Sequence, residues 1–243
     1  PLYSDINLSP YDYILENELE YKFHFSPKII NKISYTKNQE LASHTFSHYY
    51  CLEPGQTESS FAADLKLNIK VIKNKFGVEM TSLVFPRNQV KKEYLQVLTK
   101  NNIKCYRGNE TNWIYRKKMS LMLKRGLRLI DSYLNITGSN TYELKDIKKE
   151  FPYNIPSSSI LRPVTFNDSL LKRLKMKRIK SQMTHAAKYD KLFHIWWHPH
   201  NFGNDIEANI LFLKEIFKHF VFLKIKYGMC SLNMKEISEK IEV

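Results

Sequence analysis

The chain has few cysteines, and their number and spacing exclude several classes of protein. Cys51, Cys105 and Cys230 are the three cysteines among 243 residues, and they lie far apart. An odd and widely spaced set argues against a disulfide framework and against a zinc knuckle built from cysteines. We therefore expect a reducing compartment, with a cytoplasmic location favoured.

The sequence also lacks long hydrophobic runs and base-stacking motifs. No stretch of about 18 apolar residues is present, so no membrane span is predicted. Lys and Arg number 38 against 24 Asp and Glu, a formal charge of +14, but the lysines are dispersed in stretches such as NIKVIKNKF, as on solvated helix faces. Because no aromatic-rich RNP-like strand accompanies the charge, we expect no nucleic acid partner; a basic nucleic-acid-binding protein is a distant alternative.

The apolar residues that are present, 43% of the chain, suffice for a substantial core. Phe61, Leu65, Ile69 and Phe76 recur at helical spacing, which predicts a helix that ends at Gly77. Strands are predicted at MTSLVFP, IKCYR and LFHIWWH, and helices at residues 29–33, 94–98, 113–134, 166–174 and 205–223. This alternation is typical of a parallel sheet or barrel with crossover helices, and the lack of repeats or linkers favours one domain over residues 1–243.

Two histidines four residues apart form the first candidate site. His44 and His48, in ASHTFSH, follow a predicted strand, and in a helical turn both imidazoles would project from one face and share a divalent ion. A catalytic metal site usually needs a third ligand, often a carboxylate, and an open position for water. Taken alone, the pair is better explained as two incidental histidines at the start of a helix.

Polar groups follow two further predicted strands. LVFPRNQ ends with Arg87, Asn88 and Gln89, which can hydrogen-bond a substrate or orient a carboxylate, or simply form a polar turn. FHIWWHPHNFG brings His198 and His200 to the end of an aromatic strand, and aromatic walls with polar tips suit sugar rings. The alternative is that one of the two tryptophans belongs to the core and that His194 is a satisfied interior histidine.

Together these blocks resemble the polysaccharide deacetylase (NodB-homology) family of carbohydrate esterases, in particular a bacterial subgroup associated with surface polysaccharides. HTFSH resembles the family's His-Ser/Thr-x-x-His metal motif, FPRNQ its arginine motif, and WWHPHNFG its late strand with a catalytic histidine. The resemblance implies an α/β fold, a distorted (β/α) barrel of the polysaccharide deacetylase type. It also implies a metal-dependent hydrolase that removes acetyl groups from an N-acetylated sugar or polysaccharide.

The resemblance further implies roles for individual residues. His44 and His48 would bind the divalent ion, with zinc expected, His198 would act as general acid, and Arg87 would orient the base or pair with substrate. The carbohydrate substrate would contact polar and aromatic side chains of these loops: Asn88, Trp113, Trp197, His200 and Asn201. The resemblance does not specify the oligomeric state.

Two departures from the family pattern keep an alternative open. NETNW has Asn112 where the family has an aspartate that tunes the catalytic histidine, and Glu110 or Asp131 would have to substitute. The family's first, Asp-rich motif has no counterpart after an apolar run, so we expect the first strands, with the general base and the third metal ligand, to be missing from this chain and to precede Pro1. A catalytically inactive glycan-binding relative is the alternative function.

Overall fold

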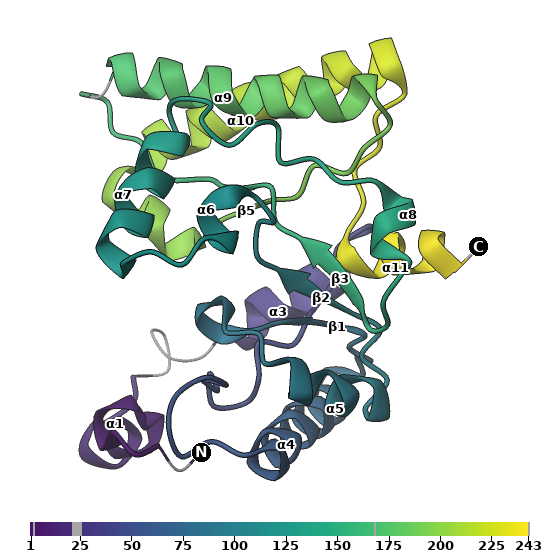
Figure 1. Ribbon diagram of the computed structural model, residues 1–243. Helices are drawn as coiled ribbons and strands as arrows, with labels where there is room; N and C mark the ends of the chain where they lie inside the picture. The colour runs from purple at the N-terminus through teal and green to yellow at the C-terminus, as the bar shows by residue number, and fades with distance from the viewer. Residues whose placement is uncertain (2, 21–25, 168, 243) are drawn as a thin grey trace. The chain divides into compact units, whose positions relative to one another are not determined.

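The computed structural model describes residues 1, 3–20, 26–167 and 169–242, and its contacts divide the chain into two compact units (Figure 1). Unit 1 comprises Pro1–Gly108, Lys148–Ile155 and Leu232–Val243, and unit 2 comprises Asn109–Ile147 and Pro156–Ser231. Neither unit is a contiguous segment, and the single-domain organisation stays a prediction. Within the described ranges, no helix has both the length and the apolar character needed to cross a bilayer.

Unit 1 is built around a small sheet with the order β1-β2-β3, formed by Ser82–Val84, Cys105–Gly108 and Tyr153–Pro156. β1 and β2 are parallel, with Leu83 opposite Tyr106. On the other side of β1, Ser43 makes an isolated parallel bridge to Leu83. The segment that leads to His44 therefore runs alongside β1 in the same direction.

The described part of unit 1 also contains helices. They are α1 Pro10–Glu16, α3 Pro27–Ser34, α4 Glu58–Phe76, α5 Leu95–Lys100 and α11 Met234–Glu242, with short 3-10 turns at Ile6–Leu8, Pro86–Asn88 and Lys92–Tyr94. The prediction for α4 is confirmed: Thr57 and Ser60 form a capping box at its start, and Gly77 takes a left-handed conformation at its end. The α4 face packs on the sheet through Phe61, whose ring stacks on Tyr94 at 5.1 Å.

Unit 2 contains the helices α6 Trp113–Arg116, α7 Leu121–Asp131, α8 Leu144–Ile147, α9 Ser169–Lys188 and α10 Ile206–Tyr227, and a 3-10 segment Pro199–Asp205. A pair of two-residue parallel strands, β4 Ser159–Ile160 and β5 Ile195–Trp196, accompanies them. The core is formed mainly where α9 packs against α10, with Ile179, Phe212 and Ile216 among its buried side chains.

The structure corrects one predicted helix. The helix expected over residues 113–134 is divided into α6 and α7, because Lys117 takes an extended backbone and the Ser120 hydroxyl accepts a hydrogen bond from the Leu123 N–H to begin a new helix.

The combination of helices with small parallel sheets agrees with the α/β prediction. Among the described residues the strands form one three-stranded and one two-stranded sheet, and no closed barrel is present. The barrel therefore remains a prediction.

Candidate functional site

The loop that contains His44 and His48 is irregular and has no helical turn, so the expectation of a helical turn is wrong. Buried and exposed side chains alternate from Ser43 to Tyr49, and both imidazoles fall on the exposed face. Because this alternation repeats every two residues, His44 and His48, four residues apart, lie on the same side of the loop. The two imidazole centroids are 4.8 Å apart with their planes at 66°.

Hydrogen bonds fix the orientation of both imidazoles. His44 Nδ1 lies 2.7 Å from the Val84 carbonyl at the end of β1, and His48 Nδ1 lies 3.1 Å from the Tyr50 hydroxyl. When Nδ1–H donates to a carbonyl, the neutral ring carries its lone pair on Nε2, the tautomer that suits metal ligation. The chemistry of these two groups therefore fits two positions of a zinc-type site.

A buried carboxylate beneath the loop holds its backbone. Asp64, on α4, accepts hydrogen bonds from the N–H groups of Phe46 (2.7 Å) and Ser47 (3.1 Å), and from the Ser47 hydroxyl. These donors lie between the two histidines in the sequence. Asp64 was not predicted as a functional residue, yet it ties the exposed histidine loop to a rigid helix.

Two further polar residues of α4 extend this support. Asn68 Oδ1 accepts a hydrogen bond from the Ser43 hydroxyl at 2.8 Å, and the Ser60 hydroxyl is hydrogen-bonded to the Tyr49 hydroxyl. Ser60, Asp64 and Asn68 are four residues apart, so they form one polar stripe beside the apolar face of the helix. That spacing is visible in the sequence and is the signal that could have identified them.

Arg87 contacts the residue that orients His48. Its guanidinium lies 4.0 Å from the centroid of the Tyr50 ring, and its Nη1 lies 3.7 Å from Glu53 Oε1. Gln89 donates a hydrogen bond to the same Glu53 oxygen at 2.7 Å. Arg87 therefore packs on Tyr50, the partner of the His48 ring, from the turn that directly follows β1.

Asn88 is tied to the next strand. Its Oδ1 accepts a hydrogen bond from Arg107 Nη2 at 2.8 Å, and burial lowers the pKa of Arg107 to about 10. His44, Arg87 and Arg107 thus come from the carboxyl ends of neighbouring parallel segments, where loops of α/β proteins gather their functional groups.

Backbone strain is concentrated in these two loops. Thr45, His48, Arg87 and Asn88 all have φ between 51° and 64°, the left-handed region that non-glycine residues rarely adopt. Each such residue costs of the order of 1 kcal/mol or more, and such costs cluster at functional sites. Two of these residues, Thr45 and His48, belong to the histidine loop, and the other two, Arg87 and Asn88, to the turn that follows β1.

The late histidines lie in unit 2. His198 and His200 are exposed, and their rings stack at 5.2 Å where the 3-10 segment Pro199–Asp205 begins. Trp196 meets the His198 ring edge to face at 5.4 Å. Trp197 is half-buried and lies parallel to Phe202, with the ring centroids 6.3 Å apart, so core packing accounts for one face of its indole.

Asn112, which stands where the resemblance predicts an aspartate, has a structural role. Asn112 Oδ1 caps α6 by accepting a hydrogen bond from the Ile114 N–H at 3.1 Å, and Asn112 Nδ2 donates to Glu110 Oε2 at 2.7 Å. Burial, together with the charge of Asp131, raises the pKa of Glu110 to about 7. Glu110 is therefore a carboxyl group that changes its protonation state near neutral pH.

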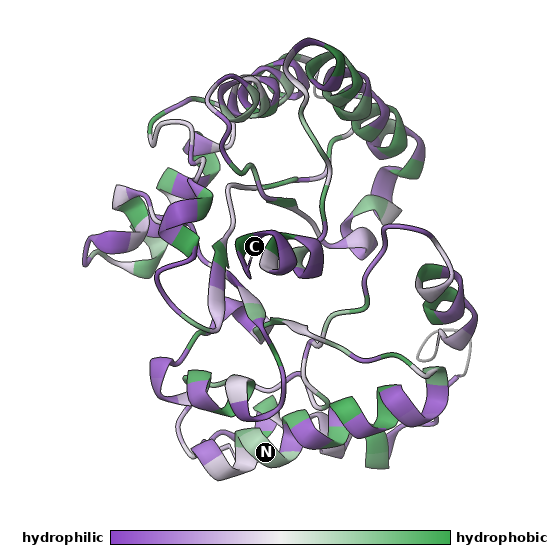
Figure 2. Cartoon of the chain, turned by 90° about the vertical axis from the view of Figure 1, so that its right-hand side faces the viewer, coloured by the Kyte–Doolittle hydropathy of each residue, from purple (hydrophilic) through white to green (hydrophobic). Residues whose placement is uncertain are grey.

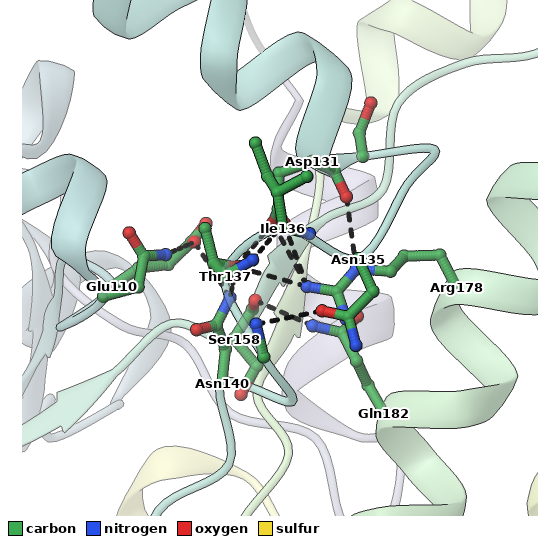
Figure 3. A network of polar contacts seen from close by, with 12 residues as sticks. Glu110, Asp131, Asn135, Ile136, Thr137, Asn140, Ser158, Arg178 and Gln182 are labelled. Atoms are coloured by element: carbon green, nitrogen blue, oxygen red, sulfur yellow. Dashed lines mark hydrogen bonds and ion pairs between the residues drawn. The ribbon is translucent and has the colours of Figure 1, made fainter.

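Asp131 holds a turn of the chain (Figure 3). Its Oδ1 accepts hydrogen bonds from the N–H groups of Ile136 (3.1 Å) and Thr137 (3.0 Å), and its Oδ2 pairs with Arg178 Nη2 of α9 at 3.1 Å. Both ion-pair partners are buried. These contacts engage both carboxylate oxygens in joining the end of α7 to α9, which is a structural role.

The predicted site residues belong to both units. The structure places His44, His48, Arg87 and Asn88 together in unit 1, and it places Trp113, Trp197, His198, His200 and Asn201 in unit 2. Among the residues described, no three His, Cys, Asp or Glu side chains come close enough to hold a metal ion. The histidine pair therefore accounts for two ligands of the expected site.

Comparison with known proteins gives a family match within unit 1. Residues 12–106 match the model for the polysaccharide deacetylase family, a range that contains both histidines, Asp64, Arg87 and Asn88. No curated protein matches the chain. The match supports the assignment of residues 12–106 to the polysaccharide deacetylase family.

Proposed function

We propose that the chain is part of a metal-dependent hydrolase that removes acetyl groups from an N-acetylated sugar or polysaccharide. The family match supports action on acetylated carbohydrate. The observation that carries the finer proposal is the pair of oriented imidazoles, 4.8 Å apart, beside the carboxyl end of β1. A distorted (β/α) barrel and a carboxylate from the family's first motif, as third ligand and general base, complete the proposal.

In this proposal His44 and His48 supply two ligands of a divalent ion, with zinc expected. When bound, such an ion polarises a carbonyl and lowers the pKa of water. The residues of this chain keep the two rings in place: the Val84 carbonyl orients His44, and the Tyr50 hydroxyl orients His48. Arg87 packs on the Tyr50 ring and so supports the residue that orients His48. Arg87 also faces solvent, where it can pair with substrate.

His198 is proposed as the general acid. Its exposed imidazole, as imidazolium, would donate a proton to the leaving amine of the sugar. The remaining proposed roles are contacts with the sugar, made by Asn88, Trp113, Trp197, His200 and Asn201. Trp113 is exposed and its Nε1 donates a hydrogen bond to the Ile136 carbonyl at 3.0 Å, which fixes the indole.

The test measures metal content and acetate release from N-acetylated oligosaccharides in the natural full-length protein. His44→Ala and His48→Ala should lose bound metal and activity together, whereas His198→Ala should keep its metal and lose turnover. His185→Gln is the matched control, because His185 lies on α9 and its Nδ1 contacts the Thr141 hydroxyl at 2.8 Å. Unchanged metal content and acetate release in both His44→Ala and His48→Ala would overturn the proposal.

A second function, glycan binding without hydrolysis, is favoured by the capping role of Asn112. In that case the wild-type protein should bind N-acetylated oligosaccharide in a calorimetric titration and release no acetate when zinc is supplied. Acetate release by the wild-type protein at a rate that His198→Ala abolishes would exclude this alternative.

A further inference from the structure

Helix α10 presents apolar side chains on its outward face as well as on its buried face. Phe212, Ile216 and Leu223 lie in the core of unit 2. On the opposite side five apolar residues remain exposed, with exposed fractions from 41% to 82%: Ile206, Ile210, Phe217, Val221 and Ile225. Their spacing of four, seven, four and four residues places them in one stripe along the helix.

This stripe is larger than the scattered apolar residues of an ordinary surface. It runs along most of a helix of 22 residues, which is about 33 Å long. Contiguous exposed apolar surface of this kind marks a site of association with another molecule or with a membrane. Figure 2 shows apolar residues, in green, along the long helices among polar ones.

A basic groove borders the stripe. It lies between α9 and α10, has a volume of about 1000 Å³, and is floored by apolar side chains such as Met176 and Phe212. Seven of its lining residues are Lys or Arg, among them Lys172, Lys214 and Lys218. Lys214 is four residues beyond Ile210 in the stripe and Lys218 is four residues further, so on a helix these lysines adjoin the apolar stripe.

The acidic residue that lines the groove does not balance this charge. Glu215 pairs with Lys218 at 2.7 Å and approaches Lys180 at 3.9 Å. The hydrogen bond from Lys218 lowers the pKa of Glu215, which keeps it ionised. One carboxylate against seven cations leaves the described lining of the groove strongly positive.

We propose that the α9–α10 face of unit 2 docks on the surface of an anionic lipid bilayer. The apolar stripe would enter the headgroup region, and the lysines beside it would contact anionic headgroups, a combination typical of helices that lie in a membrane surface. A soluble polyanion would account for the lysines and would leave Phe217 and Ile225 in water. A second copy of the chain would bring two lysine-rich grooves together, in a chain that already has a net charge of +14.

The experiment is flotation of the protein with vesicles of phosphatidylcholine alone or of phosphatidylcholine with phosphatidylglycerol. Binding should require phosphatidylglycerol and weaken with salt. Each lysine near an anionic surface contributes about fivefold to binding, so Lys172→Gln/Lys177→Gln/Lys214→Gln should weaken it about a hundredfold. The matched control removes three exposed lysines of unit 1, Lys66, Lys70 and Lys92, and should bind much more strongly than that variant.

A second triple variant tests the apolar stripe. Ile210→Gln/Phe217→Gln/Val221→Gln keeps good helix formers on exposed positions, so the fold should persist, as circular dichroism and the melting temperature would show. Its binding to phosphatidylglycerol vesicles should fall at least tenfold, since apolar burial is lost.

Three outcomes would overturn the proposal. Equal binding to neutral and anionic vesicles would remove the role of the lysines. Vesicle binding that needs the lysines but is unchanged in the stripe variant would indicate a surface for a soluble polyanion instead. Self-association in sedimentation velocity that the stripe variant abolishes, without vesicle binding by the wild-type protein, would indicate an interface between copies.

Discussion

Replacement of Asp64 by asparagine should loosen the histidine loop and destabilise the protein. Asp64 is 8% exposed and accepts hydrogen bonds from two backbone N–H groups and one hydroxyl of the loop. Asparagine keeps one acceptor oxygen, but its NH₂ group would face the N–H of Phe46 or of Ser47. Hydrogen bonds to a charged group contribute about 1.5–3 kcal/mol each, so the loss of one or two such bonds predicts destabilisation by about 2–4 kcal/mol.

The assay is urea unfolding of the wild-type protein and the variant, followed by hydrogen exchange of the backbone amides at residues 46 and 47. The variant should unfold at lower urea concentration with an unchanged m-value, and these amides should exchange faster because their acceptor is weakened. In the full-length protein the same substitution should weaken metal binding about tenfold or more, as loss of a supporting contact does in metal sites.

The control for this prediction is Asp190→Asn, at an exposed position with φ of 49° that asparagine adopts readily. It should change the free energy of unfolding by less than about 0.5 kcal/mol. If Asp64→Asn were as mild as this control, with unchanged amide exchange, the argument that the carboxylate holds the loop would be refuted.

Three further predictions concern buried polar groups and close packing. Glu110→Gln should stabilise the protein relative to wild type at pH 8 by up to about 3 kcal/mol, and this difference should vanish near pH 4.5. The reason is that the pKa of Glu110 is raised to about 7 in the folded protein, so ionisation of this carboxyl destabilises the folded wild-type protein as the pH rises from 4.5 to 7. Urea unfolding at a series of pH values measures the difference. Gly108→Ala should lower the free energy of unfolding by about 1–3 kcal/mol in thermal unfolding, since a Cβ there would lie 1.9 Å from Asn154 Oδ1 and 2.8 Å from Asn154 Cγ. Adding Asn154→Ala to this variant should recover most of the lost stability. Asp131→Ala should cost about 3–5 kcal/mol because it leaves Arg178 buried without its charge partner, and Arg178→Met added to it should be milder in chemical denaturation.

Each of these has a result that would contradict it. A constant difference between Glu110→Gln and wild type from pH 4.5 to pH 8 would mean that the carboxyl does not titrate in that window. Strict additivity of the Gly108 and Asn154 substitutions would mean that the two groups do not collide. Additive costs at Asp131 and Arg178 would mean that the ion pair contributes no coupling.

The sequence predicted the elements that local rules determine. α4 was found from its apolar spacing and Gly77, because capping and helical period act within a few residues. The shape of the histidine loop was not predicted, since it depends on Asp64, which lies sixteen residues beyond His48 in the chain and reaches the loop only after α4 has packed on the sheet. The strand LFHIWWH was predicted too long, because only Ile195–Trp196 finds a parallel neighbour.

The candidate site was predicted in part for the same reason. The spacing of His44 and His48 is a local pattern, and the rings come together in an irregular loop whose buried and exposed side chains alternate, without the expected helical turn. The contact of Arg87 with Tyr50 joins residues from two separate loops, so no local pattern could indicate it. The structural use of Asp131 likewise became visible only with its tertiary partner Arg178, whereas Asn112 acts through a local cap on the Ile114 N–H.

The left-handed backbone of the site loops limits how stable this chain can become while it keeps their side chains. Glycine would relieve about 1 kcal/mol at His48 or Arg87, where φ is 53° and 51°. A library selected only for heat resistance should therefore accumulate glycine at these two positions, and each gain would delete an imidazole or a guanidinium. In the proposed hydrolase, selection for activity and selection for stability oppose each other at these positions, so a thermostabilised form that keeps the activity should leave them unchanged and draw its gains from elsewhere.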